Sequence, residues 1–332
     1  MGFIVYKMDE IEIDVREALR EAIDEEMERD ESVFIIGEEV AQYNGAYKVT
    51  KGLLNKYGSG RVFDTPVSEC AFSGLAIGAA LTGLRPIVEF MSFNFSFVAF
   101  DQIVNNAFKL HYMSGGRFKV PIVFRGPNGA AASVSCQHSH CVESIYSNFP
   151  GCKVVAPYTP QDAKGLLKSA IRDDNPVFVL ENELLYGMKG FVSQGEHLIA
   201  IGKGRIMKCG DDVTLISYSR MLTFCQEAAD YMAKKGVSVE IIDLRTIKPL
   251  DVDIIVNSVK KTNRVVLVEE GHYFAGICAE IAATICDCCF DYLDAPIARV
   301  CQKETPLPYS RALEIESIPN VRRIIQAIEG VI

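Results

Sequence analysis

The sequence predicts an α/β protein made of two doubly wound domains, the first larger than the second. Its length of 332 residues suggests two domains. Short apolar runs alternate with amphipathic helical segments, which is typical of βαβ units and a parallel sheet. This alternation stops in a glycine-rich stretch at about 186–212 and then starts again. We therefore predict a first domain at 1–190, a linker at 191–208 and a second domain at 209–332.

The first domain opens with a helix-start signal. Asp14 and Glu17 have the spacing of a capping box, and apolar residues follow at helical spacing as far as Met27. Thr159, Pro160 and Asp162 predict a second helix start, with a cap residue, a proline in the first turn and an acid behind it. Residues 95–113 predict one long and largely buried helix. Strands are expected at 33–37, 85–90, 120–124, 154–156 and 177–180.

The second domain repeats the βαβ pattern after the linker. Helical segments lie between its apolar runs, and a last helix is expected at 321–328. Its strands are expected at 213–217, 237–242, 264–269 and 297–300.

Charge and hydropathy exclude several classes of partner. The net charge is −9, whereas binding to nucleic acid or to an anionic membrane needs a basic face. No apolar run reaches the roughly 18–20 residues of a membrane span. Four acidic residues in the first 14 are unlike a signal or transit peptide. We expect a chain that binds neither nucleic acid nor membrane, located in the bacterial cytoplasm or, if it is a processed eukaryotic chain, in the mitochondrial matrix.

The 11 cysteines are odd in number and scattered through apolar stretches, so we expect free, mostly buried thiols in a reducing compartment. Cys286 and Cys289 form a CxxC pair, but no second pair exists to complete a zinc site. Together with Cys278 they follow helical spacing, which favours a core face.

The usual phosphate-binding and nucleophile motifs are absent. No Walker A sequence, no G-x-G-x-x-G before a helix and no G-x-S-x-G elbow is found. A doubly wound chain without such a loop is not expected to hold a nucleotide by itself.

Glu69 is the first candidate for a functional residue. It follows a predicted strand that ends near Asp64, and it opens an apolar helix that runs to Leu81. Ligands gather at the carboxyl ends of parallel strands. A carboxylate in the first turn can equally serve only the helix dipole. The apolar character of the helix favours a desolvated carboxyl that shares a proton.

A histidine loop is the second candidate. Cys136, His138, His140 and Cys141 lie within six residues, but alternating positions on one extended segment rarely converge on one metal ion. The preceding stretch is rich in glycine and alanine, which indicates a mobile loop that presents His138. An acid/base role and a merely solvated histidine both remain open at this point.

The aromatic cluster at 93–97 is the third candidate. Core packing explains such a cluster by default, and a flat aromatic face for a heterocycle is the functional alternative. Phe95 is the residue concerned.

These segments, in this order, resemble the beta subunits of the thiamine-diphosphate-dependent 2-oxoacid dehydrogenases. The resemblance covers nearly the whole chain. The matching strings are 63–69, 83–90, 93–95, 112–116, 124–129, 137–139, 181–187, 243–249 and 293–296. The strings at 93–95 and 112–116 favour the pyruvate member of the family.

The resemblance implies a pyrimidine-binding domain followed by a transketolase-type C-terminal domain. Glu69 matches the glutamate that hydrogen-bonds the aminopyrimidine ring nitrogen of the cofactor. Protonation of that ring favours the tautomer whose nitrogen removes the thiazolium proton. Phe95 matches the aromatic residue packed against the pyrimidine. His138 matches the loop histidine implicated in substrate handling and in acyl transfer to lipoyl.

The resemblance also implies partners. In the family the diphosphate and its magnesium are held by a G-D-G motif on the alpha subunit, and the nearest string here, Gly210-Asp211-Asp212, fails that pattern. We therefore expect an α2β2 heterotetramer with pyruvate dehydrogenase alpha subunits and with thiamine diphosphate at the α/β interface. Dihydrolipoyl acetyltransferase is the expected core partner.

Two further matches concern a metal and the core. A potassium site made largely of backbone oxygens matches Ile122, Ala170, Ile171, Asp173 and Asn175, although a tight solvated turn would explain these residues equally well. Asp294 falls where the family's C-terminal domain meets the peripheral-subunit-binding domain of the acyltransferase. Val98 departs from the family pattern, since it leaves no polar group after the 93–95 motif.

Three alternatives remain. The chain could be the beta subunit of a branched-chain oxoacid or acetoin dehydrogenase. It could be a non-catalytic scaffold that kept the fold, although Glu69 and His138 in their motifs speak against this. A lone flavodoxin-like cofactor protein would bind its cofactor as a purified monomer, which we do not expect.

Overall fold

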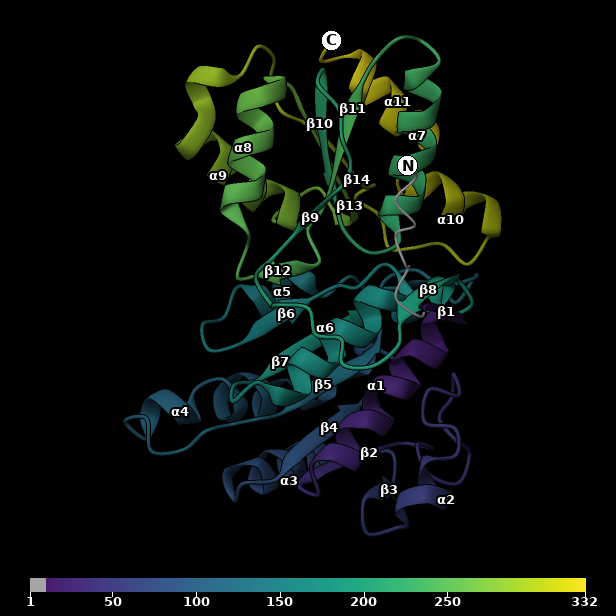
Figure 1. Ribbon diagram of the computed structural model, residues 1–332, viewed down its shortest axis with the longest axis vertical. Helices are drawn as coiled ribbons and strands as arrows, with labels where there is room; N and C mark the ends of the chain where they lie inside the picture. Colours follow the sequence, from purple (N-terminus) through teal and green to yellow (C-terminus); the bar gives the residue numbers. More distant parts are fainter. Residues whose placement is uncertain (1–9) are drawn as a thin grey trace, which may run out of the picture.

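Three sheets organise the computed structural model, which describes residues 10–332 (Figure 1). The first domain holds a seven-stranded sheet in the order β12-β6-β7-β5-β4-β2-β3, and the second holds a five-stranded sheet in the order β14-β13-β10-β11-β9. A small antiparallel pair, β1-β8, lies beside the first sheet. The strands are β1 (Glu10–Asp14), β2 (Val33–Gly37), β3 (Val62–Asp64), β4 (Arg85–Glu89), β5 (Val123–Pro127), β6 (Lys153–Val155), β7 (Val177–Glu181), β8 (Lys189–Ser193), β9 (Arg205–Lys208), β10 (Val213–Ser217), β11 (Val239–Asp243), β12 (Thr246–Lys248), β13 (Val265–His272) and β14 (Ala298–Gln302).

Helices cover both faces of the two main sheets, as expected for doubly wound domains. Alternate side chains of β2 point to opposite faces, so Ile35 packs with α1 and α6 while Ile36 packs with α3. The helices are α1 (Val15–Arg29), α2 (Leu53–Tyr57), α3 (Glu69–Leu81), α4 (Leu110–Met113), α5 (Glu143–Ser147), α6 (Pro160–Arg172), α7 (Met221–Ala233), α8 (Val252–Thr262), α9 (Ile277–Cys289), α10 (Arg311–Ser317) and α11 (Val321–Glu329). In the second domain, α8 and α9 cover one face, and α7 and α11 cover the other (Figure 1).

The predicted helix starts are confirmed. Asp14 caps α1 by accepting from the backbone N–H of Glu17. Thr159 and Asp162 form a complete capping box at the start of α6, with Pro160 at the first helical position.

The single long helix predicted at 95–113 is wrong. The segment is divided into a 3₁₀ helix, η1 (Phe93–Ala99), a π-helical turn, η2 (Gln102–Ala107), and α4. The hydroxyl of Ser96 donates to the carbonyl of Phe93, three residues back, which matches the tighter 3₁₀ spacing. The aromatic rings of Phe93 and Phe108 pack against Phe178 of β7. Packing against the sheet therefore sets the winding here, and α4 is carried outward on an exposed arm (Figure 1).

The strand predicted at 120–124 begins later, at Val123. Pro121 cannot donate to a sheet ladder, and the N–H of Val120 bonds the carbonyl of Asp174 outside the sheet. The strands expected at 33–37, 85–90, 154–156, 177–180 and the four of the second domain are present with end shifts of up to three residues.

The two domains are joined by more than a linker. β12, from the second half of the chain, pairs antiparallel with β6 of the first sheet. One continuous apolar core contains residues of both domains, including Phe178 and Ile242. The predicted linker, 191–208, holds the end of β8 and all of β9. We propose a first domain at 1–190, a linker at 191–208 and a second domain at 209–332; residues 1–9 lie outside the described residues.

The prediction of mostly buried cysteines is wrong in part. All 11 thiols are free, but only Cys152, Cys225, Cys278, Cys289 and Cys301 are buried. Cys286 is exposed although its helical spacing from Cys278 predicted a core face, because α9 packs on its sheet through a narrower stripe of residues. Within residues 10–332, none of the helices has the length and apolar character needed to cross a membrane.

Candidate active site

Glu69 is buried at the carboxyl end of the first sheet. Strands β3, β2 and β4 run parallel and end side by side, and Glu69 is the first residue of α3 after β3. Its exposed fraction is 7%. A carboxyl at this edge lies where ligands of doubly wound sheets bind.

A second carboxyl, Glu38, lies against Glu69. Glu38 directly follows β2 and is buried. Burial raises the pKa of Glu38, and the neighbouring Glu69 raises that pKa further through its charge and a hydrogen bond. The raised pKa of Glu38 therefore favours a proton on that carboxyl, next to Glu69.

Two buried polar atoms at this site lack hydrogen-bond partners. In the described part of the chain, Glu38 Oε1 and Thr65 Oγ1 are buried and make no hydrogen bond. An unsatisfied buried polar atom costs roughly 1–3 kcal/mol, which a bound ligand would offset. The site therefore fits a heterocycle with hydrogen-bonding nitrogens.

Asp64 positions the chain around Glu38. Its two carboxylate oxygens accept from the backbone N–H groups of Ala41 (2.7 Å) and Gln42 (2.9 Å). The residue ends β3, so it ties the loop after β2 to the neighbouring strand. Asp64 therefore stabilises the loop that follows β2 and carries Glu38.

Phe95 and His138 lie together. The ring of His138 meets the ring of Phe95 edge to face, with centroids 5.5 Å apart. Phe95 lies in η1, which follows β4 and packs against α3. Glu69, Phe95 and His138, predicted from separate motifs, therefore come from elements at one edge of the first sheet.

No metal-ligand group forms from the cysteines and histidines of the 136–141 loop in the described residues. The group of that kind within residues 10–332 is Glu269, Cys278 and Cys301, all buried. Glu269 already accepts from the backbone N–H groups of Ile277 and Cys278 at the start of α9. It therefore serves as a helix cap.

Below the site lies a buried ion triad. Arg125 of β5 is paired with Glu89 of β4 and Glu181 of β7, and all three are buried. The hydroxyl of Tyr186 donates to Glu181 at 2.7 Å. Through Arg125, in the middle of β5, the triad ties together the carboxyl ends of β4 and β7 and holds these three adjacent strands in register.

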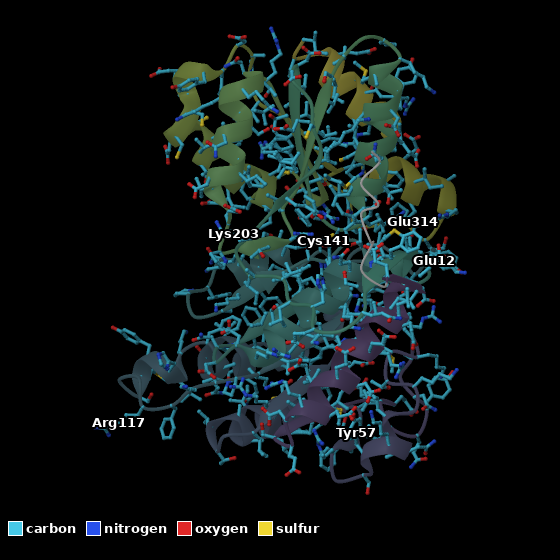
Figure 2. All side chains as sticks on the ribbon, in the orientation of Figure 1. Glu12, Tyr57, Arg117, Cys141, Lys203 and Glu314 are labelled. Carbon is cyan, nitrogen blue, oxygen red and sulfur yellow. The ribbon has the colours of Figure 1, made fainter. Side chains whose placement is uncertain are left out.

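A buried carboxyl also lies at the domain junction. Glu143 of α5 accepts from the side-chain amide of Asn128 at 2.9 Å. Burial, with the charges of Glu270 and Glu269, raises the pKa of Glu143 to about 8. Figure 2 shows the nearby Cys141 at this junction, and burial raises the pKa of its thiol as well.

The raised pKa of Glu143 predicts a loss of stability at alkaline pH. Because its folded-state pKa of about 8 lies above its ordinary value, the carboxyl takes up a proton on folding. Its stabilising contribution is complete below about pH 4.5 and is lost as pH rises through about 8. Glu143→Gln keeps an acceptor for Asn128 without the charge. From pH 6 to 9 we expect wild type to lose roughly 3 kcal/mol more than the variant in urea unfolding. Parallel curves would contradict this.

The residues matched to a potassium site gather at the end of α6. The guanidinium Nη1 of Arg85 donates to the carbonyl oxygens of Ile171 and Asp173, both at 3.0 Å. The carbonyls of Ala170 and Ile122 accept backbone hydrogen bonds, and Asn175 bonds to the carboxylate of Asp173. Each carbonyl has a second lone pair, so oxygens of the right type are present. The positive charge of Arg85 opposes a cation there.

Asp294 lies at the surface of the second domain. Its carboxylate is 3.7 Å from Arg264, and more than half of its side chain is exposed. It is therefore accessible to another protein.

Apolar side chains beside Glu69 face solvent. Val67 is 82% exposed and Leu75, on α3, is 61% exposed. The predicted apolar helix, α3, is therefore exposed on one side. A cleft of about 460 Å³ lies between α3 and the edge strand β3, lined by apolar residues that include Phe63, Leu75 and Leu84. Contiguous exposed apolar surface of this kind marks a protein interface.

Two families of known domains match the chain. The transketolase pyrimidine-binding domain matches residues 11–189, and the transketolase C-terminal domain matches residues 202–324. A split-gene transketolase, solved as an inactive beta4 tetramer, shares the fold with a TM-score of 0.78 at 20% identity, over 96% of this chain and 98% of that one. Fold and site thus define a thiamine-diphosphate-binding protein of the transketolase class.

Relatives that match nearly the whole chain identify the family within this class. The pyruvate dehydrogenase E1 component subunit beta of Rickettsia conorii is 55% identical, over 97% of this chain and 98% of its own. The mitochondrial E1 beta subunits of Dictyostelium discoideum and Homo sapiens are each 53% identical, over 96% of this chain and 91% and 90% of theirs. The chain belongs to the family of pyruvate dehydrogenase E1 beta subunits. It is part of the acetyl-transferring enzyme, and an alpha subunit is its partner.

Glu38 is the site residue that sequence reasoning missed. Its position directly after the buried strand 33–37 was available as a signal, since that strand end lies at a ligand-binding edge. Its pairing with Glu69 depends on the adjacency of β2 and β3, which the sequence alone did not give.

Proposed function

We propose that this chain supplies the pyrimidine half of an active site shared with the alpha subunit in an α2β2 heterotetramer. There the enzyme decarboxylates pyruvate oxidatively and transfers the acetyl group to lipoyl on the acyltransferase core. The burial of Glu69 against Glu38 at the sheet edge is the observation that carries this proposal.

Thiamine diphosphate supplies a carbanion nucleophile and an electron sink for the 2-oxoacid. Glu69 would bind the pyrimidine ring nitrogen and hold the proton that the ring needs, with Glu38 as the second member of the pair. Phe95 would pack on the ring and exclude water. His138, exposed at the edge of Phe95, would bind the substrate or the incoming lipoyl group.

The alpha subunit would close the site over α3. Support comes from the exposed Val67 and Leu75 beside Glu69 and from the arm around α4, where Tyr112 is 88% exposed. Figure 2 shows Arg117 at the far end of that arm. The absence of a phosphate-binding motif in the sequence agrees with an alpha subunit that holds the diphosphate and its magnesium.

Calorimetry tests the shared site directly. We expect thiamine diphosphate with magnesium to bind the co-expressed α/β complex with a stoichiometry of one per αβ pair, and the isolated chain to show no binding. Turnover should favour pyruvate over branched-chain 2-oxoacids and acetoin. Tight binding by the isolated chain would contradict a shared site, and preference for a branched-chain substrate would contradict the pyruvate assignment.

We propose that potassium binds at the end of α6, through the carbonyls of Ala170 and Ile171 with Ile122, Asp173 and Asn175. Replacing sodium by potassium at equal ionic strength should then raise the free energy of unfolding by roughly 1.4 kcal/mol when the potassium concentration is about ten times its dissociation constant. Arg85→Met should increase this difference by removing the competing cation. Identical unfolding curves in the two salts would contradict the site.

We propose that Asp294 contacts the peripheral-subunit-binding domain of dihydrolipoyl acetyltransferase. Its exposure supports this. Asp294→Asn should weaken binding of that domain to the α/β complex about 5- to 30-fold, the range for one interfacial charge worth roughly 1–2 kcal/mol. Asp287→Asn serves as the control, because Asp287 is an exposed residue of α9 and the chemical change is the same. Equal affinities for the two variants and wild type would argue against Asp294.

A further inference from the structure

Two histidine–aromatic contacts join the loop at 133–141 to η1. His138 meets Phe95, and two residues further on His140 meets Phe97, with centroids 5.5 Å and 5.4 Å apart and interplanar angles of 78° and 76°. The two segments therefore lie side by side, and each histidine of the loop contacts one phenylalanine of η1.

Asn94 holds this register. Its side-chain oxygen accepts from the backbone N–H of His140 at 2.9 Å and faces the ring Nδ1 of His140 at 2.6 Å. Its amide nitrogen donates to Ser92 Oγ at 2.8 Å, and the residue is 7% exposed. A backbone N–H can only donate, so the oxygen of the amide must face His140. That oxygen cannot donate, so Nδ1 of His140 carries the proton.

The loop is anchored on both sides of His138. The carbonyl of His140 accepts from the N–H of Gly129 at 2.9 Å, and the buried Ser139 donates to the carbonyl of Ser135 at 2.7 Å. The backbone N–H of His138 also bonds Ser135, at 3.2 Å. The imidazole of His138 is exposed and lies beside Phe95.

We infer that Asn94 and His140 are positioning residues: their double hydrogen bond fixes the loop so that the His138 imidazole stays beside Phe95, ready for acetyl transfer. The inference rests on the proposed function of His138 and adds two residues that do not touch the reacting atoms. Without the side-chain hydrogen bond, His138 would keep its chemistry, but its position beside Phe95 would no longer be fixed. A shift of about 1 Å in a reacting group costs up to 10²-fold in rate.

A matched pair of variants separates the two contacts of His140. His140→Phe keeps the edge-to-face ring against Phe97 but removes the donor at Nδ1. His140→Asn removes the ring but keeps a donor at the same number of bonds from Cβ. In the α/β holoenzyme, we expect acetyl transfer to lipoyl to fall about tenfold in kcat for His140→Phe, with KM for pyruvate within twofold. His140→Asn should stay within about threefold of wild type.

A third variant tests the same bond from the other side. Asn94→Asp keeps both acceptor contacts, with the Ser92 hydroxyl able to donate in return, and should behave like His140→Asn. The unfolding midpoint and thiamine diphosphate affinity are measured for each variant. If His140→Phe loses cofactor affinity or stability in proportion to its rate, the residue is merely structural and the inference is overturned.

His138→Ala separates failure of the inference from failure of the proposed function. Wild-type transfer by His138→Ala would overturn the role of His138 and, with it, the reason for positioning it. Impaired transfer by His138→Ala together with wild-type transfer by His140→Phe would overturn the inference alone. Impairment of both, with recovery in His140→Asn, supports it.

Discussion

Glu69→Gln is expected to lower the rate of pyruvate decarboxylation by about 10²–10⁴-fold while leaving the α/β complex intact. Gln has the shape of Glu but cannot donate a proton to, or share one with, the pyrimidine ring. The buried neighbour Glu38 follows a different strand, β2, so it is not expected to take the place of Glu69. Single-turnover decarboxylation on the reconstituted enzyme measures the effect.

Glu28→Gln is the matched control, since it makes the same chemical change on the exposed end of α1, where Glu28 pairs with Lys56. It should turn over normally. Size-exclusion chromatography should show the same complex for both variants. Turnover of Glu69→Gln at the control rate would favour the non-catalytic scaffold.

Arg125→Met is expected to lower the free energy of unfolding by about 3–5 kcal/mol. Removal of the guanidinium leaves Glu89 and Glu181 buried close together with no compensating charge. Burial already raises the pKa of Glu89, and only the positive charge of Arg125 opposes that shift. Urea unfolding of the chain at pH 7 measures the loss.

A variant without the three charges tests whether the uncompensated carboxylates cause the loss of stability. Arg125→Met combined with Glu89→Gln and Glu181→Gln should recover most of the stability, since no uncompensated charge remains. Lys235→Met, at an exposed pair with Glu329, should leave the unfolding midpoint where it is. A small effect of Arg125→Met alone would mean that the carboxyls become protonated or are hydrated by water that enters the space left by the guanidinium.

Much of the fold follows from local sequence. Asp14 and Thr159 start helices because their side chains accept from N–H groups three residues away, and both partners lie in the same short segment. Strand β2 is a run of apolar residues that any parallel sheet would bury on both faces. The motifs around Glu69, Phe95 and His138 likewise predict site residues from the sequence, because each motif is contiguous.

The contacts between distant segments follow only from the tertiary structure. The break in the helix predicted at 95–113 arises from aromatic contacts with β7, about 70 residues away. The pairing of Glu38 with Glu69, and of Asn94 with His140, joins residues that no periodicity relates. β12 enters the first sheet from the second domain. Hydrogen bonds and packing between distant segments carry no signal in local spacing. The sequence therefore determined most of the helices and strands and the candidates Glu69, Phe95 and His138, whereas the fold determined the winding of 95–113 and the partners of each candidate.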